Sequence, residues 1–119
     1  MILHISAVTF AVDDMPRSIE SYRKLGFELL YGGDRSDFSS LKAGEAFVNL
    51  IASPGYQQRW WGRAIFRVAD VDTLYRIFWA EGLMPEAPPK NAAWGERFFH
   101  LIDPDGHELS FAQQLLPPT

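Results

Sequence analysis

The strongest constraint on this chain of 119 residues is an internal repeat with a fixed offset of 56 residues. Residues 8–15 read Val-Thr-Phe-Ala-Val-Asp-Asp-Met, and residues 64–71 read Ala-Ile-Phe-Arg-Val-Ala-Asp-Val. The same offset relates Gly26 to Gly82. An offset that persists over a strand-like run, a helix-like run and the turn after it favours two copies of one folding unit over two unrelated segments.

Each copy begins with an alternating apolar run and continues into an amphipathic helix. Val8, Phe10 and Val12 alternate with smaller or polar residues, which is typical of a half-buried strand. Asp14 can then cap a helix that has Pro16 in its first turn, and Asp70 occupies the same place in the second copy. The apolar stripes at helical spacing are Ile19, Tyr22 and Leu25 in one copy and Val71, Leu74, Tyr75 and Phe78 in the other.

Shorter strand-like runs follow each helix, so each copy is predicted to be a β-α-β-β-β module. The runs are 27–31, 38–42 and 46–52 in the first copy and Leu83 onward, 97–102 and 108–112 in the second, where 85–93 is a proline-rich loop. The predicted fold class is α+β, with two modules whose mixed sheets curl to form a cleft. We interpret residues 1–119 as a single domain, with module one at about 4–53 and module two at about 61–114, and expect residues 117–119 to fray.

Composition limits the functions that remain. The chain is 47% apolar and 22% charged, as in folded globular proteins, and it has no cysteine for disulfides, thiolate metal sites or nucleophilic catalysis. No apolar run is long enough to span a membrane, and the N-terminus lacks the pattern of a signal peptide. The net charge of −4, without a lysine or arginine cluster, disfavours nucleic acid as a partner. We therefore expect a soluble cytoplasmic protein.

The strand faces that point away from the helices predict where a cleft would be. Residues of opposite parity to the helix-facing positions share these faces. The predicted lining residues are Phe47, Asn49, Arg63, Ile65, Arg67, Phe98, His100 and Ser110. Because a buried arginine is unfavourable unless it is paired, two arginines on one face indicate a wet cleft or carboxylate partners such as Glu108.

Two segments resemble a known family. Residues 11–27, Ala-Val-Asp-Asp-Met-Pro-Arg-Ser-Ile-Glu-Ser-Tyr-Arg-Lys-Leu-Gly-Phe, resemble the opening of the vicinal oxygen chelate superfamily (glyoxalase I, bleomycin resistance proteins and extradiol dioxygenases). Residues 98–109, Phe-Phe-His-Leu-Ile-Asp-Pro-Asp-Gly-His-Glu-Leu, resemble the final hairpin of the same family. The resemblance covers about residues 4–114 and is closest in character to the bleomycin resistance branch. It implies paired βαβββ modules in a homodimer.

The resemblance also implies four metal-ligand positions, from which this sequence departs. The family's enzymes hold a divalent metal through side chains such as His, Glu or Gln. The matching positions here are Ala7, Asn49, Arg63 and Ser110. Because only Asn49 offers even a weak carbonyl ligand, we expect no metal and no other cofactor. We interpret His4 as an exposed strand-edge residue and His107 as a surface turn residue.

Aromatic residues favour ligand binding. Phe38 lies in the run Asp-Phe-Ser-Ser-Leu, which resembles a ligand-stacking segment of the bleomycin resistance branch. Trp61 and Trp94 are further candidates to stack on a planar ligand, although a dimer interface is an equal interpretation for Trp60 and Trp61. The complete predicted ligand-binding set is Phe38, Phe47, Asn49, Trp61, Arg63, Ile65, Arg67, Trp94, Phe98, His100 and Ser110, with no catalytic residue.

We therefore predict a metal-free, homodimeric binding protein that sequesters a planar, aromatic-containing small molecule, as antibiotic resistance members of the family do. Arg63, Arg67 and Arg97 indicate a ligand with an anionic or carbonyl-rich part, which argues against bleomycin, a cationic drug. The alternative is a glyoxalase- or dioxygenase-like lyase or isomerase with a displaced or absent metal, using His100 and Glu108 as an acid/base pair. A structural or regulatory dimer with a collapsed cleft is the third hypothesis.

Overall fold

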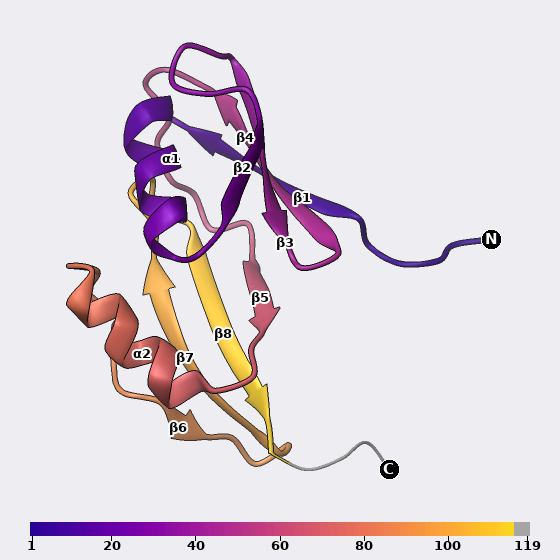
Figure 1. Cartoon of the computed structure of the whole chain (residues 1–119), viewed down its shortest axis with the longest axis vertical. Helices are drawn as coiled ribbons and strands as arrows, with labels where there is room; N and C mark the ends of the chain where they lie inside the picture. The colour runs from indigo at the N-terminus through magenta and orange to yellow at the C-terminus, as the bar shows by residue number, and fades with distance from the viewer. Residues whose placement is uncertain (116–119) are drawn as a thin grey trace. The chain divides into compact units, whose positions relative to one another are not determined.

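The chain separates into two compact units, Met1–Arg59 and Trp60–Thr119, called here the first and second units. The structure, a computed structural model, describes residues 1–115, so the expected fraying of 117–119 lies outside the described residues. Each unit contains one helix and one four-stranded sheet (Figure 1).

The first unit has the predicted β-α-β-β-β order. Its elements are β1 (Ala7–Val12), α1 (Met15–Lys24), β2 (Glu28–Tyr31), β3 (Phe38–Ala43) and β4 (Ala46–Ala52). The strands lie in the order β1-β4-β3-β2, with β1 parallel to β4 and the other neighbours antiparallel. The mixed sheet with one helix confirms the α+β prediction for this half.

The second unit repeats this topology. Its elements are β5 (Arg63–Arg67), α2 (Val71–Ala80), β6 (Lys90–Asn91), β7 (Glu96–Ile102) and β8 (Glu108–Gln114), and the strand order is β5-β8-β7-β6. The strand predicted from Leu83 onward is wrong, because the pairing begins only at Lys90, within the predicted proline-rich loop. Pro85, Pro88 and Pro89 have no backbone N–H to donate to a ladder, which delays the strand until the last of them has passed.

The two helices begin and end in the same way, because the repeat preserves the residues that cap them. The Asp14 side chain accepts a hydrogen bond from the Arg17 N–H at 3.1 Å, and Asp70 accepts one from Thr73 at the same distance. At the other end Gly26 has a φ of +104°, and the N–H groups of residues 26 and 27 close a Schellman motif onto the carbonyls of residues 23 and 22. Residues 82 and 83 bond in the same way to residues 79 and 78.

The apolar core of each unit lies between its helix and one face of its sheet. In the first unit the Tyr22 ring stacks on Phe10 with centroids 6.0 Å apart, and both side chains are buried. In the second unit Phe78 is fully buried and meets Phe111 edge-on at 5.0 Å. The predicted stripes are confirmed, except that Leu74 and Tyr75 are only half-buried.

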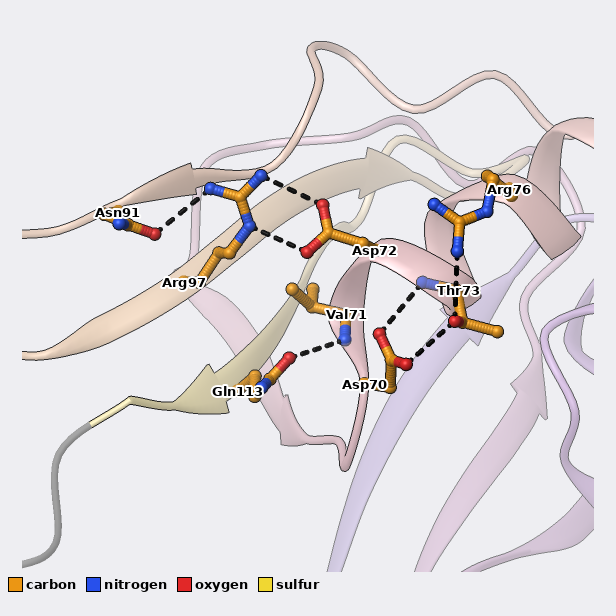
Figure 2. A network of polar contacts seen from close by, with 8 residues as sticks. All are labelled: Asp70, Val71, Asp72, Thr73, Arg76, Asn91, Arg97 and Gln113. Carbon is orange, nitrogen blue, oxygen red and sulfur yellow. Dashed lines mark hydrogen bonds and ion pairs between the residues drawn. The ribbon is translucent and has the colours of Figure 1, made fainter.

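A polar network fastens the start of α2 to its sheet (Figure 2). The Arg97 guanidinium donates two hydrogen bonds to the Asp72 carboxylate, at 2.8 and 2.9 Å, and a third to the side chain of Asn91. The Arg97 hydrogen bonds lower the pKa of Asp72, and the same contact raises the pKa of Arg97. Gln113 accepts from the Val71 N–H at 2.9 Å. Arg97 therefore binds α2 on the helix side of the sheet, and the prediction that it faces an anionic part of the ligand is wrong.

Candidate ligand-binding faces

Each sheet has a second face, opposite its helix, which we call the open face. Burial alternates along β4, where Val48 and Leu50 are fully buried while Phe47 and Ile51 are 40% and 45% exposed. The same alternation in β3 puts Phe38 on the open face, opposite Ile51. The parity that the sequence predicted is therefore confirmed for the first unit.

The open face of the first unit mixes aromatic and aliphatic side chains with polar ones. Its rows across the strands are Ala7–Phe47–Lys42–Glu28, Thr9–Asn49–Ser40–Tyr31 and Ala11–Ile51–Phe38. The Tyr31 and Phe38 rings are 6.4 Å apart, and the Asn49 amide donates to the Thr9 hydroxyl at 3.4 Å. Three predicted site residues, Phe38, Phe47 and Asn49, thus share this face.

The open face of the second unit is rich in charged and hydrogen-bonding groups. Its rows are Arg63–Glu108–Ile102, Ile65–Ser110–His100 and Arg67–Ala112–Phe98–Lys90, followed by Gln114–Glu96. Trp94 joins this face because its ring lies nearly parallel to that of Phe98, with an angle of 20° and centroids 6.2 Å apart. Seven predicted site residues share this face: Arg63, Ile65, Arg67, Trp94, Phe98, His100 and Ser110.

Glu96 holds two of these side chains in place. One carboxylate oxygen accepts from the Trp94 indole N–H at 2.6 Å, and the other accepts from Arg67 at 3.2 Å. Arg67 also donates to the side chain of Gln114 at 2.7 Å. Glu96 begins β7, and its side chain is only 24% exposed, so its carboxylate is partly shielded from solvent.

The two open-face arginines each have a carboxylate partner. Arg63 pairs with Glu108 at 3.1 Å, as the sequence predicted, and lies over the Trp60 ring. Arg67 pairs with Glu96 instead, since Glu108 lies two rows away on β8. The arginines are therefore neutralised locally, and their charge alone does not define the ligand.

His100 stands out on this face because its Nδ1 is buried without a hydrogen-bond partner among the described residues. Burial lowers the pKa of His100 below its ordinary value of 6.5, and Arg63 and Lys90 lower it further, while Glu108 and Glu86 oppose them. The ring is consequently neutral near pH 7. The Glu108 carboxylate of the hypothetical acid/base pair is engaged with Arg63.

Trp61 is the one predicted site residue that lies on neither open face. Its indole N–H donates to Nδ1 of His107 at 2.8 Å, and its ring meets the His107 ring edge-on. His107 is only 2% exposed, so its interpretation as a surface turn residue is wrong. It is held inside the turn because its N–H donates to the Asp103 carboxylate at 2.9 Å.

The metal-ligand positions of the family carry no donor set. Arg63 is paired with Glu108, Ser110 is buried, and Ala7 has no donor atom. Within residues 1–115, no group of three or more His, Asp or Glu side chains is placed to hold a metal ion.

Sequence reasoning missed several open-face residues. Tyr31 has the right parity, and the register of β2 with β3 would have identified it. Lys90 and Gln114 could not be found, because β6 was not predicted and β8 was ended too early.

Comparisons with known proteins agree with this architecture. The family model described as "Glyoxalase/Bleomycin resistance protein/Dioxygenase superfamily" matches residues 2–111. The bleomycin resistance protein of Geobacillus stearothermophilus is 32% identical over 123 residues, which span 87% of this chain and 92% of that protein. The chain therefore belongs to the glyoxalase/bleomycin resistance protein/dioxygenase superfamily, as the two sequence segments predicted.

Two solved structures show the same fold. The crystal structure of a bleomycin resistance determinant encoded on transposon Tn5 has a TM-score of 0.81 at 23% identity, over 96% of this chain and 100% of that one. A bleomycin-binding protein complexed with bleomycin has a TM-score of 0.77 at 22% identity, over 95% of this chain and 99% of that one. No helix in the described part of the chain has the length and apolar character needed to cross a membrane.

Proposed function

We propose that this protein binds a small molecule with a planar aromatic part and sequesters it without transforming it. The observation that carries the proposal is the contrast on the open faces between exposed rings and missing metal ligands. Phe38 and Trp94 offer exposed stacking surfaces, and the half-buried Phe98 ring packs against Trp94. The family's ligand positions are filled by an alanine, an ion-paired arginine and a buried serine.

The relatives support the same class of function. The relative from Geobacillus stearothermophilus is named a bleomycin resistance protein, and one structural neighbour is a complex with bleomycin. Ligand binding is thus a property associated with this fold, and we extend it to this chain. The proposed contact residues are those predicted from the sequence, with Trp61 acting next to His107 rather than on a sheet face.

We also propose that the protein is a cytoplasmic homodimer. The N-terminal residues Met1, Ile2, Leu3 and Ile5 are between 81% and 110% exposed, and apolar surface of this extent is typical of chains that associate. Light scattering with size-exclusion chromatography should give twice the chain mass of 13.5 kDa. Cell fractionation should recover the untagged protein with cytoplasmic markers.

The function is tested by binding and turnover measured on the same samples. Purified protein is titrated calorimetrically with a panel of aromatic compounds, and each mixture is then analysed by mass spectrometry. We expect saturable binding with the ligand recovered unchanged, and less than about 0.1 equivalents of divalent metal by elemental analysis. Stoichiometric metal, or conversion of a bound compound that His100→Ala abolishes, would instead establish the lyase or isomerase.

A further inference from the structure

The side chains on the open face of the second unit indicate the charge of the ligand. We propose that it is a subsite for an aromatic anion, in which Trp94 provides the stacking surface, Lys90 binds the anionic group, and Glu96 positions Trp94. The inference rests on the proposed function and adds the chemical class of the ligand.

Trp94 is built as a fixed platform rather than a loose surface ring. It lies in the turn between β6 and β7, where the Gly95 N–H bonds to the carbonyl of Ala92 and the Ala92 N–H bonds to that of Glu96 at 2.7 Å. Leu115 donates to the carbonyl of Gly95 at 2.8 Å from the other side. The indole N–H is held by Glu96, yet the residue remains 72% exposed. A preorganised and exposed ring binds planar ligands with little loss of conformational entropy.

Of the charged residues in the rows of this face, Lys90 has no ion pair within residues 1–115. Both carboxylates of the face are engaged, Glu96 with Arg67 and Glu108 with Arg63. The Lys90 ammonium group lies 5.5 Å from the centroid of the Phe98 ring. Glu86 is an opposing charge in the same neighbourhood, since Glu86 and Lys90 both act on His100, but the two form no ion pair in the described part of the chain. Lys90 and Trp94 both contact the Phe98 ring, and an anionic aromatic ligand stacked on Trp94 would supply the ion-pair partner that Lys90 lacks.

The test uses three probes with one ring system: 2-naphthoate, its neutral analogue 2-naphthamide, and the cation 2-naphthylmethylammonium. Affinities are measured by calorimetry at constant ionic strength. Trp94 is followed through its indole N–H signal in NMR spectra, assigned with Trp94→Phe. We expect 2-naphthoate to bind most tightly and to shift the Trp94 signal.

Lys90→Gln should weaken 2-naphthoate binding by about two- to fivefold, the usual range for an exposed ion pair, and leave 2-naphthamide unchanged. Lys24→Gln is the control, since Lys24 lies at the end of α1, away from both open faces. It removes the same charge and should leave both affinities unchanged.

Two variants at Glu96 separate positioning from charge. Glu96→Gln retains an oxygen that can accept from the indole, so the Trp94 signal should stay in place and 2-naphthoate should bind at least as tightly. Glu96→Ala removes the acceptor, so the Trp94 signal should move and the affinity for both neutral and anionic probes should fall. Equal effects of the two variants on the Trp94 signal would contradict a positioning role.

The outcomes distinguish this inference from the function on which it rests. If none of the probes binds saturably, the proposed function itself fails for planar aromatics. If they bind without shifting the Trp94 signal, or if the cation binds most tightly, binding survives and the aromatic-anion subsite is wrong. A Trp94 signal that shifts with protein concentration rather than with 2-naphthoate would assign the face to a second copy of the chain.

Discussion

The two sheets have the same arrangement of rows but different side chains on their open faces, with more charged residues in the second unit. Phe38 and Phe98 occupy equivalent places, opposite Ile51 on β4 and Ala112 on β8. The first strand contributes Ala7, Thr9 and Ala11 in one unit, and Arg63, Ile65 and Arg67 in the other. The helix sides, by contrast, keep the same caps and similar rings. Packing constrains the helix side, whereas the open side is free to differ, and we therefore assign ligand recognition to the open faces.

The largest expected effect concerns the side that the two units share. Tyr22 and Phe78 are 56 residues apart, and both are fully buried under their sheets. Tyr22→Ala and Phe78→Ala should each lower the free energy of unfolding by about 3–5 kcal/mol, as is usual for large buried rings. Urea denaturation measures this. Ile77→Ala, on the exposed part of α2, should change it by less than about 0.5 kcal/mol. A loss confined to one of the two buried positions would break the equivalence of the helix sides.

A glycine present in only one unit gives the next effect. Gly32 has a φ of +82°, and a Cβ there would overlap the carbonyl oxygen of Phe38 and come within 2.6 Å of Ser39 Oγ. Gly26 has a similar φ but open space around it. Gly26→Ala should destabilise by about 1–2 kcal/mol through backbone strain alone. Gly32→Ala should lose about 1–3 kcal/mol more, since the clash adds to the strain. Equal losses in thermal unfolding would mean that the Gly32 turn can open without penalty.

The open faces should respond differently to the loss of equivalent rings. Removing one stacked ring is expected to weaken a planar ligand by about 0.5–1.5 kcal/mol, or roughly two- to thirteenfold. Phe38→Ala should weaken 2-naphthamide and 2-naphthoate by the same factor, since no cation adjoins Phe38 in its row. Phe98→Ala should weaken 2-naphthoate more, because Phe98 supports both Trp94 and Lys90. Identical selectivity in the two variants, measured by calorimetry, would remove the distinction between the faces.

The smallest expected effect is on the free energy of unfolding at low pH, and it concerns the cap of α2, where Asp70 accepts from a hydroxyl as well as from the backbone. The Thr73 N–H and hydroxyl, which both donate to Asp70, lower the pKa of Asp70 below 3.8. A carboxyl whose pKa is lowered by folding stabilises the fold above its unfolded pKa, and this contribution is lost as pH falls below about 3.8. Asp70→Asn should flatten the acid limb of the stability profile between pH 5 and pH 2. Thr73→Val removes the hydroxyl donor but keeps the backbone donor, so it should flatten that limb less than Asp70→Asn, and the reverse order would contradict this account.

The sequence predicted most of the fold because the patterns that define each copy are local. The parity of Phe10, Val12 and their counterparts depends on neighbours along the chain, the same pattern recurs 56 residues later, and the structure confirms both. The position of β6 did not follow, since its two residues carry no periodic pattern and depend on β7 for pairing.

The candidate site could be predicted only as a set of faces. Parity predicted eight of the eleven residues, and the structure puts ten of them on an open face, but parity could not identify side-chain partners. The pairing of Arg67 with Glu96 depends on the register of three strands, and the orientation of Arg97 toward Asp72 follows from where β7 begins. The Trp94 platform depends on a hairpin whose first strand, β6, was not predicted.

The brevity of β6 has a kinetic consequence. Lys90 and Asn91 pair with β7 through only two register positions, whereas β7 and β8 are paired through seven. A strand with so few partners opens locally at low cost in free energy, so its amide protons should exchange with solvent faster than those of β8. A ligand that contacts both Lys90 and Trp94 would hold β6 against β7. Its binding would then slow deuterium uptake at the β6 amides even if the ligand makes no hydrogen bond to the backbone.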